Sequence, residues 1–494
     1  MPAATQRLRF LLDTNILIPL QDSMRVLAPN LANFVKLAGV GGHQLLYHPA
    51  SKADIERDKD VQRRDRTLAR LQQYTRLDGV PPSPRNTTQT SANDACDNDI
   101  LHALECSAVH ALVTEDKEIH AKARQAGFVD WVYNIQTAED WLRRLHEPTE
   151  VHLPNIADVA MYSLTNQLDT LLFDSLRSSY DTTERSFNKW FHDKAKTGRK
   201  AWIARTEQGS VEAICIYDIQ TDEVINAERE ALPGLSLKLC TFKVGEQMRG
   251  KKIGELFLKA AFRFATENRC ENIFAHTSED QFYLLALMND FGFQPRGMYG
   301  TDIVLVKAHP SSPPLEDAPP LDYAKLYFPH YRKDASVQKF LVPIQPQYHQ
   351  ILFPDLARQG QLFSGISVAG NAIKQAYLCK AQTNQVKPGD IVLFYRTGDE
   401  KAVTTLGIVE RYEVHDNATN IMQIVSRRTV YSQRDIEVMA KSPTKVMLFR
   451  LASHFHSPIP YSVLTQEGIV SGPIQSITKI SDDSFSRILR SSKR

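Results

Sequence analysis

The first 150 residues alternate between short apolar runs and longer segments whose apolar residues recur at helical spacing. Apolar runs end at Leu12, Tyr47 and Val113, and each has the length of a buried strand. A helical pattern follows each of these runs, as in the stretch from Ser51 to Tyr74. Strands that alternate with helices are typical of a parallel sheet. The pattern therefore predicts a parallel α/β sheet in this part of the chain.

The next part, to about residue 307, groups its helical patterns around longer strand patterns. Glu207, Gln208 and Gly209 form a turn between two of the strands, which favours a hairpin and a mixed sheet. The expected helices are Val159–Leu176, Thr183–Lys196, a long helix that begins near Gly254, and Asp280–Asp290. The expected strands are Ala201–Arg205, Val211–Tyr217, Leu235–Val244 and Asn272–His276.

The last part, from about residue 325, has short strand patterns separated by turn residues. Strands are expected at 339–345, 369–379, Ile391–Tyr395, 404–414 and Val446–Arg450. Several short strands with regular turns favour a small β-barrel. The three patterns together predict a multi-domain protein of mixed α/β and α+β class.

Two composition shifts suggest where the parts meet. A polar, proline-bearing segment spans Glu147–Pro154, and prolines are dense in His309–Pro320, as in a semi-rigid linker. At 494 residues the chain is long enough for about three domains. We therefore expect domains at 1–148, 149–308 and 336–494, with a proline-rich linker at 309–335.

Composition narrows the class of protein. The chain is 42% apolar and 23% charged with a formal net charge of +2, so any nucleic-acid surface must be a local patch. Its six cysteines are scattered without a CxxC pair, which argues against structural zinc and a disulfide framework. No apolar run approaches the roughly 20 residues that span a bilayer. We expect a cytoplasmic protein with no membrane association.

Acidic residues follow the strand patterns of the first part. They are Asp13, Asp54 or Glu56, Asp97 or Asp99, and Asp116. The strand-to-helix junctions of a parallel sheet all lie at one edge. Clustered carboxylates repel one another unless a divalent cation lies between them, and oxygen ligands suit Mg²⁺ or Mn²⁺. Such a metal activates water and stabilises the charge of a phosphodiester transition state.

Each of these acids also has a structural interpretation. Asp13 and Asp116 are suited to capping helices, and Ser51 with Asp54 fits a capping box. Glu56 fits a solvated helix position. The metal hypothesis rests on the combination, because every junction carries an acid.

The segments LLDTNI, DNDILHAL, LVTEDKEIHAKA and VYNIQTAEDWLRRL resemble a PIN domain over roughly residues 5–146. The resemblance implies a metal-dependent endoribonuclease, with RNA (tRNA among the candidates) as substrate and a toxin or defence role with a separate antitoxin. It implies metal ligation by Asp13, Asp54, Asp99 and Asp116, with Asp97 as a further ligand and Glu56 as the rival of Asp54. Asn15 and Thr114 match the supporting polar positions.

A glycine-basic loop precedes the long helix of the second part. It reads Arg249-Gly250-Lys251-Lys252-Ile253-Gly254. Free backbone N–H groups and cationic side chains at a helix N-terminus suit a pyrophosphate, although a plain turn between strand and helix has the same composition.

This loop, the order of elements and the segment FGFQPRG resemble a GNAT N-acetyltransferase. The resemblance implies acetyl-CoA as cofactor: the backbone of Phe242 to Val244 would pair with the pantetheine arm. The N–H groups of Arg249, Gly250, Lys251, Lys252, Ile253 and Gly254 would bind the pyrophosphate. Two positions depart from the pattern, since Lys252 replaces a glycine and Met288 replaces the usual tyrosine acid. Tyr283, Glu246 or His276 would then have to substitute, or the acid is dispensable.

The turn Lys387-Pro388-Gly389-Asp390 before an aromatic strand resembles the PUA-like ASCH/EVE group. That resemblance implies an RNA-binding module, with Lys374, Tyr395 and Arg396 as candidates for a base pocket or for ordinary surface and core positions. The sequence thus predicts an endoribonuclease fused to an acetyl-CoA-binding module and an RNA-binding module. The alternative is an RNA- or protein-directed N-acetyltransferase whose other two domains serve as binding modules; a third hypothesis is a non-catalytic assembly.

Overall fold

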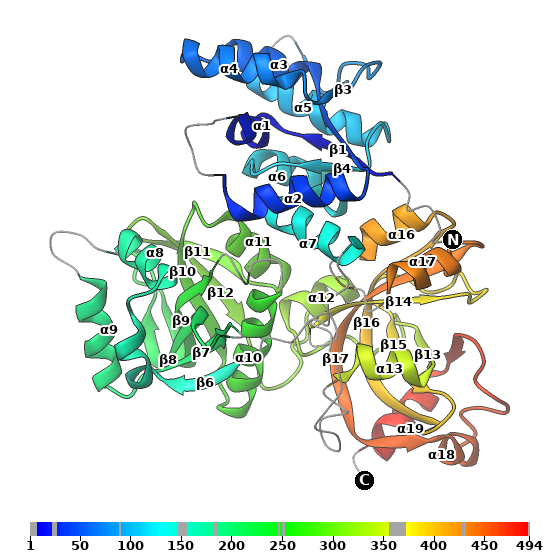
Figure 1. Cartoon of the computed structure of the whole chain (residues 1–494). Helices are drawn as coiled ribbons and strands as arrows, with labels where there is room; N and C mark the ends of the chain where they lie inside the picture. Colours follow the sequence, from blue (N-terminus) through cyan, green and yellow to red (C-terminus); the bar gives the residue numbers. More distant parts are fainter. Residues whose placement is uncertain are drawn as a thin grey trace. The chain divides into compact units, whose positions relative to one another are not determined.

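The computed structural model describes residues 7–21, 27–87, 90–146, 156–180, 186–206, 208–245, 248, 252–354, 372–425, 428 and 431–492 (Figure 1). The chain divides into two compact units. The first comprises Met1–Glu150 with Asn417–Ser426, and the second comprises Val151–Asp416 with Arg427–Arg494.

The first unit contains a five-stranded sheet in the order β3-β2-β1-β4-β5, parallel throughout. This confirms the parallel α/β sheet. The elements are β1 (Arg9–Leu12), α1 (Thr14–Gln21), α2 (Pro29–Val40), β2 (Gln44–Tyr47), α3 (Pro49–Glu56), α4 (Val61–Leu71), β3 (Thr75–Arg76), α5 (Ala92–Glu105), β4 (Ala111–Val113), α6 (Lys117–Gln125), β5 (Val132–Tyr133) and α7 (Ile135–His146).

Both faces of this sheet are covered, which explains the uninterrupted apolar run in β1. Phe10 packs edge-to-face on Phe34 of α2 and on Trp141 of α7, with ring centroids 5.4 and 5.3 Å apart. Leu11 points to the other face and joins a cluster that includes Ile100 of α5. Strands buried on both faces need apolar residues at every position.

Two local predictions for this unit are wrong. Helix α3 begins at Pro49 with His48 as its N-cap, and the Ser51 hydroxyl inside the helix has no hydrogen-bond partner among the described residues, so there is no capping box. Asp97 and Asp99, which the sequence pattern places just before a helix, lie inside α5, whose cap is Ser91.

A helix from far along the chain completes the first unit. Helix α16 (Ala418–Val425) groups with residues 1–150, and the Gln423 side-chain amide donates a hydrogen bond to the His110 carbonyl. The predicted domain at 336–494 includes this stretch. The pattern of apolar and polar residues in α16 predicts a buried face but does not indicate which domain covers that face.

The second unit contains a seven-stranded mixed sheet in the order β11-β12-β10-β9-β8-β7-β6, in which only β9 and β10 pair in parallel. The elements are β6 (Ala157–Ala160), the 3-10 helix η2 (Met161–Gln167), α8 (Leu171–Tyr180), α9 (Phe187–Lys196), β7 (Lys200–Arg205), β8 (Val211–Val224), β9 (Ala231–Val244), α10 (Ile253–Glu267), β10 (Asn272–Ser278), α11 (Phe282–Asp290), β11 (Gln294–Tyr299) and β12 (Asp302–Ala308). The mixed sheet is confirmed.

The helices lie on opposite faces of this sheet. Phe173 of α8 and Phe187 of α9 pack on one face with Ile214 of β8. Phe257 of α10 and Met288 of α11 pack on the other face. The expected helix Val159–Leu176 is wrong, because its first residues pair with β7 as the edge strand β6 and α8 begins only at Leu171. Pairing with a distant strand outweighs local helical spacing here.

The proline-rich segment 309–335, predicted as a linker, packs against the core of the mixed-sheet domain. It contains α12 (Pro320–Leu326), and the Lys307 ammonium donates to the carbonyl oxygens of Lys325 and Leu326 at 3.1 and 2.6 Å. Phe328 lies in the same core as Phe262, with ring centroids 5.4 Å apart. The segment therefore extends the core of the mixed-sheet domain.

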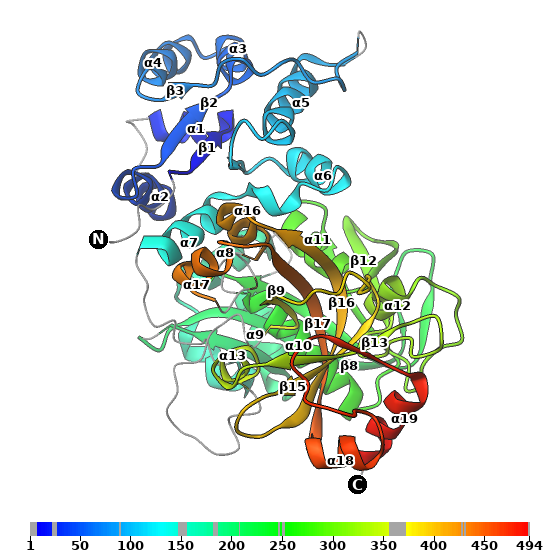
Figure 2. The ribbon, with the colours of Figure 1, turned by 90° about the vertical axis from the view of Figure 1, so that its right-hand side faces the viewer.

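The C-terminal part of the second unit is a curled six-stranded sheet in the order β14-β17-β16-β15-β13-β18. Figure 2 shows its long strands β16 and β17 side by side. Among the described residues β14 and β18 do not pair, so the sheet is not a closed barrel. Its elements are β13 (Lys339–Ile344), α13 (Pro346–Leu352), β14 (Lys374–Cys379), β15 (Ile391–Arg396), β16 (Ala402–His415), α17 (Gln433–Met439), β17 (Thr444–Pro460), α18 (Tyr461–Gln466), β18 (Thr478–Ile480) and α19 (Asp482–Ser491).

No helix within the described ranges is both long and apolar enough to cross a membrane.

Candidate functional site

Strands β9 and β10 separate in the middle of the mixed sheet. Their parallel pairing ends at Leu239 and Ala275, after which β9 continues to Val244 paired only with β8. The edge of β9 from Cys240 to Val244, which includes Phe242, is therefore left without a neighbouring strand among the described residues. Unpaired backbone groups at a strand edge can bind an extended ligand through main-chain hydrogen bonds.

A β-bulge lies at this opening. Ile216 pairs with Thr241 and Tyr217 with Leu239, so Cys240 is the extra residue on β9. A bulge leaves backbone groups out of the ladder and redirects side chains, and bulges are common beside active sites.

Two polar atoms at the opening are buried without a hydrogen-bond partner among the described residues. They are Oγ1 of Thr241 on β9 and Nε2 of His276, the first residue of β10 beyond the pairing. Side chains alternate along a strand, and the neighbours Phe242 and Ala275 pack on the α10 side. Thr241 and His276 therefore share the opposite face. Orphaned buried polar atoms are rare, which makes them candidates for contact with a ligand.

His276 is held as a neutral base. Its ring stacks on Tyr299 with centroids 4.9 Å apart and hydrogen-bonds the backbone of Ile225. Burial, and after it the charge of Lys238, lower the pKa of His276 below its usual 6.5. The imidazole is therefore neutral at pH 7 and keeps a lone pair at Nε2.

The N-terminus of α10 lies beside the same opening. Gly254 allows close packing here, because a Cβ on it would lie 2.7 Å from Leu287 and 3.6 Å from the Phe242 ring. Lys252 is the N-cap residue and has left-handed backbone geometry with φ of 57°. Arg249, Gly250 and Lys251, predicted to bind pyrophosphate, and Glu246 lie outside the described residues, whereas Ile253 begins the helix.

The first turn of α10 is bonded to the C-terminal sheet. The Lys252 ammonium donates to the carbonyl oxygen of Lys374 at 2.9 Å, and the Glu255 carboxylate accepts from the Lys374 backbone N–H at 2.5 Å. The Lys374 side chain forms an ion pair with Asp290 at the end of α11. Lys374, a sequence candidate for nucleic-acid contact, thus joins the two parts of this unit.

Met288, at the position of the family's usual tyrosine, is fully buried in the α10 and α11 core. Tyr283 lies in the first turn of α11 and is 44% exposed. Of the two substitutes that the structure describes, His276 has a buried polar atom at the opening without a hydrogen-bond partner among the described residues.

A second constellation lies at the carboxyl edge of the parallel sheet in the first unit. Asp13 follows β1 and is 5% exposed. Its carboxylate accepts hydrogen bonds from the Thr14 backbone at 2.7 Å, the Asn15 amide at 2.7 Å and the Thr114 hydroxyl at 2.6 Å. The supporting roles predicted for Asn15 and Thr114 therefore correspond to direct contacts with Asp13.

Two carboxylates of this edge have a raised pKa. Burial, together with the charges of Asp97 and Asp116, raises the pKa of Asp13 to about 6 against the effect of its hydrogen bonds. Burial likewise raises the pKa of Asp97 to about 6, with Lys122 opposing and Asp116 adding. Like charges at one site shift pKa in this direction.

The structure favours Asp97 over Asp99 as the third acid. Asp99 accepts hydrogen bonds from the Ser83 backbone at 2.7 Å and the Asn86 amide at 2.8 Å, which is a structural role in the preceding loop. On α5 the two residues are about 200° apart around the helix axis, so their carboxylates meet different neighbours, Lys122 for Asp97 and the loop at 83–86 for Asp99.

The choice between Asp54 and Glu56 as the second acid stays a prediction, and the surroundings of the two carboxylates differ. Asp54 forms an ion pair with Arg57 at 2.8 Å, and its charge acts on the Cys96 thiol together with those of Asp13 and Asp97. Glu56 is half exposed and pairs with Lys52 at 3.4 Å.

Asp116 has two roles at this edge. Its carboxylate caps α6 by accepting from the backbone N–H groups of Glu118 and Ile119 at 2.7 and 3.1 Å, while its charge acts on Asp13. Oxygen atoms of Asp94, Asp97 and Glu118 lie within 4.8 Å of one another. Sequence reasoning missed Asp94 and Glu118, which read as ordinary first-turn acids of α5 and α6.

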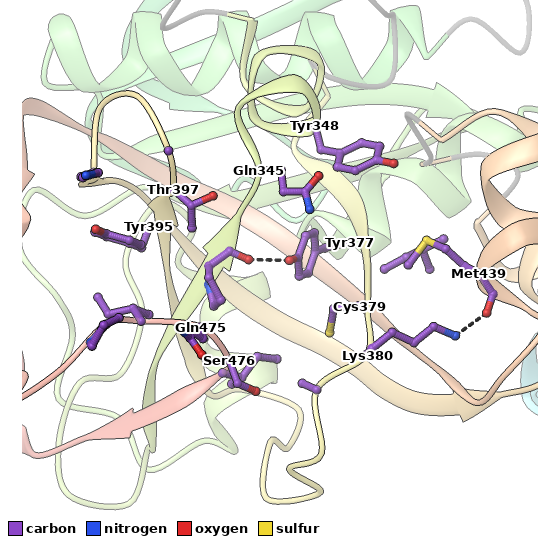
Figure 3. Close-up of a pocket in the computed structure, with 18 of the residues that line it drawn as sticks. Gln345, Tyr348, Tyr377, Cys379, Lys380, Tyr395, Thr397, Met439, Gln475 and Ser476 are labelled. Carbon is purple, nitrogen blue, oxygen red and sulfur yellow. Dashed lines mark hydrogen bonds between the residues drawn. The ribbon is translucent and has the colours of Figure 1, made fainter.

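Arg396 is not available to a ligand in the C-terminal sheet. It is buried and forms an ion pair with Asp399. Tyr395, the remaining candidate, lines a groove of about 810 Å³ in the C-terminal sheet (Figure 3).

The geometry of the opening agrees with comparison to known families. Residues 165–293 match the model described as "Acetyltransferase (GNAT) family". No curated protein matches the chain.

Solved structures that are similar to parts of the chain have low sequence identity and low TM-scores. An ASCH protein of Zymomonas mobilis is 12% identical, with 31% of this chain and 94% of that chain covered and a TM-score of 0.25. A GNAT-family acetyltransferase of Staphylococcus aureus is 12% identical, with 31% and 99% covered and a TM-score of 0.24. The PaiA N-acetyltransferase of Thermoplasma acidophilum, in complex with coenzyme A, is 11% identical, with 31% and 99% covered and a TM-score of 0.24. The similarity to GNAT-family acetyltransferases is thus carried by the family model and lies in residues 165–293.

Proposed function

We propose that this protein transfers an acetyl group from acetyl-CoA to an amine. The observation that carries the proposal is the opening between β9 and β10, bordered by a bulge and by the N-terminus of α10, inside the segment that matches the acetyltransferase model. Bound acetyl-CoA would supply the acetyl thioester from which the amine takes its acetyl group.

The residues present suit this cofactor. The free edge from Phe242 to Val244 offers backbone donors and acceptors to the amide groups of a pantetheine arm. The N-terminus of α10, with Ile253 and Gly254 in its first turn, suits a pyrophosphate. The Thr241 hydroxyl lies on the face opposite α10 and can orient a polar group at the reacting end.

His276 is the proposed general base. An amine must lose a proton as it forms an amide, and Nε2 of His276 is a buried lone pair without a partner among the described residues. A neutral imidazole at pH 7 can accept that proton, and such general bases contribute typically 10²–10⁴-fold.

The first test is calorimetry of acetyl-CoA with the full chain. A glutamate at the head of α10 would repel pyrophosphate and displace Leu287, so Gly254→Glu should abolish the heat. Gly472→Glu is the matched control, because a Cβ there meets nothing within 4 Å. No heat with the unaltered protein would refute the proposal.

The second test follows label from radioactive acetyl-CoA into lysine-rich peptides and into RNA, the two acceptor classes of the sequence prediction. His276→Gln should lower the rate at least about 100-fold while acetyl-CoA affinity stays the same. The rate of the unaltered protein should fall with acidity only below pH 6.5, because the pKa of His276 is lowered. An unchanged rate in the variant would exclude His276 as the base.

A second candidate function is metal-dependent cleavage of RNA by the first unit. The observation that favours it is the group of carboxylates at one sheet edge, with the pKa of both Asp13 and Asp97 raised to about 6. Asp13, Asp54, Asp97 and Asp116 are the residues that would hold Mg²⁺ or Mn²⁺, which would activate water there. The RNA substrate, the toxin role and a separate antitoxin rest on the sequence resemblance alone.

This candidate is tested by RNA cleavage with purified protein and Mn²⁺. Asp13→Asn should abolish cleavage because it removes the most buried carboxylate of the group. Asp65→Asn, which changes a carboxylate that is 65% exposed on α4, should leave the rate unchanged. Cleavage that survives both Asp13→Asn and a chelator would exclude this site.

A further inference from the structure

A carboxylate lies on the same face of the mixed sheet as the proposed base. Asp302 begins β12, and the residues directly opposite it are Ser278 on β10 and Tyr299 on β11. His276 lies opposite Val304, two residues further along β12. Because side chains alternate along a strand, Asp302 and His276 are diagonal neighbours on one face, about 7–8 Å apart.

The Asp302 carboxylate forms no hydrogen bond or ion pair with any residue that the structure describes. The residue follows the turn at Gly300 and Thr301 but does not bond the backbone of that turn, and it is only partly exposed. Partly buried carboxylates are usually paired, because burial costs a charged group part of its hydration. An unpaired carboxylate beside the opening therefore suits a cationic ligand.

Two other charged side chains act on His276 and offset each other. Burial and the charge of Lys238 lower the pKa of His276, whereas the charges of Asp302 and Glu223 raise it. Lys238 and Glu223 form an ion pair at 3.2 Å. The charge that remains uncompensated among these three side chains is that of Asp302, so it attracts a cation to this face.

The Tyr299 ring lies between the base and this carboxylate. It stacks on His276 with 20° between the ring planes, yet the residue is 55% exposed. Its hydroxyl has no hydrogen-bond partner in the described ranges. An open aromatic ring attracts a cation within about 6 Å of its centre. Asp302 and Tyr299 can therefore hold one positive group together.

We propose that the acceptor of the acetyl group is an aliphatic diamine, with one nitrogen at His276 and the other, as a cation, at Asp302 and Tyr299. This acceptor rests on the proposed acetyl transfer. The nitrogen at His276 gives its proton to Nε2 as it becomes an amide, while the other nitrogen keeps its charge. A short carbon chain along the sheet face connects the two positions, which are about 7–8 Å apart. A monoamine fills one of them.

The first test compares diaminobutane with butylamine, which has the same carbon chain and one nitrogen, as acceptors for the full-length protein. The kcat/KM should favour diaminobutane at least about tenfold, because the monoamine lacks the hydrogen bond between two charged groups. Asp302→Asn should remove this preference by raising the KM for diaminobutane. Asp483→Asn, at an exposed carboxylate on α19, should retain it. Equal kcat/KM for the two amines, or a preference that survives Asp302→Asn, overturns the proposal and leaves acetyl transfer itself in place.

Calorimetry of diaminobutane with the full-length protein needs no acetyl transfer and separates the two proposals. Asp302→Asn should weaken binding at least about tenfold. Tyr299→Leu should weaken it about two- to fivefold, whereas Tyr299→Phe keeps the ring and should retain the affinity. If neither amine is acetylated, the proposed function fails, and binding that depends on Asp302 then supports the cation site alone. No heat with diaminobutane, or the same heat in Asp302→Asn, overturns the cation site as well.

Discussion

Asp290→Asn should destabilise the second unit, because Asp290 neutralises two buried cations. Its carboxylate accepts from Arg450 at 2.9 Å and pairs with Lys374. Arg450 is 0% exposed and also pairs with Glu410 at 2.5 Å. Its guanidinium lies 5.0 Å from the centre of the Phe291 ring, which cannot replace the lost charge.

The magnitude follows from what remains after the change. Without Asp290, the Glu410 carboxylate alone faces Arg450, Arg428 and Lys374, and removing one partner from such a buried charge cluster costs about 3–5 kcal/mol. Asp483→Asn removes an exposed partner on α19 and should cost about 0–1 kcal/mol. The assay is thermal unfolding by calorimetry at pH 7, with both variants measured beside the unaltered protein.

A double variant separates the orphaned charge from a general loss of packing. Asp290→Asn with Arg450→Met removes one charge of each sign and leaves Glu410 paired with Arg428, and apolar replacement of buried charges is often neutral. The double variant should therefore unfold at a higher temperature than Asp290→Asn alone. Arg450→Met is measured alone as well. If the stability lost in the double variant equals the sum of the losses in the two single variants, the charge imbalance is not the cause and the reasoning is wrong.

Three further predictions concern single residues. Burial lowers the pKa of Lys307 to about 7, so the folded state disfavours the ammonium form. The free energy of unfolding should therefore rise by about 1.4 kcal/mol per pH unit from pH 7 towards 10.5. Calorimetry should show a smaller slope in Lys307→Met. At Lys252, whose φ is 57°, a glycine variant should be more stable than an alanine variant by about 1 kcal/mol, the reverse of helix propensity, as thermal melts would show. Thr114→Val removes a hydrogen-bond donor to the buried Asp13 carboxylate, which is ionised above its pKa of about 6. The variant should lose about 1–3 kcal/mol of the free energy of unfolding. Denaturant titrations should show a larger loss at pH 8 than at pH 5.

Local pattern was sufficient where one strand and its flanking helices determine the outcome. The run that ends at Leu12 reads as a strand buried on both faces, and β1 ends there with Asp13 at the sheet edge. The pattern was insufficient for Asp97 and Asp99, because both fit a helix and the choice depends on which face of α5 meets the sheet. It also failed at Val159, which helical spacing assigned to a helix and which pairs with β7 instead.

The bonds around the head of α10 could not be read from the sequence at all. Lys252 and Glu255 are more than a hundred residues from Lys374, and the bonds use the Lys374 backbone, which any residue but proline supplies in full. Neither side chain therefore carries a signal of its partner.

These bonds make the first turn of α10 depend on the C-terminal sheet. A lysine in left-handed geometry costs about 1–2 kcal/mol, and a buried carboxylate such as that of Glu255 needs a donor. The Lys374 backbone in the C-terminal sheet accepts from the Lys252 ammonium, which offsets part of this cost, and donates to the Glu255 carboxylate. Without the C-terminal sheet, Lys252 and Glu255 would both lose that partner. The helix that heads the proposed acetyl-CoA site is thus held in part by the C-terminal sheet.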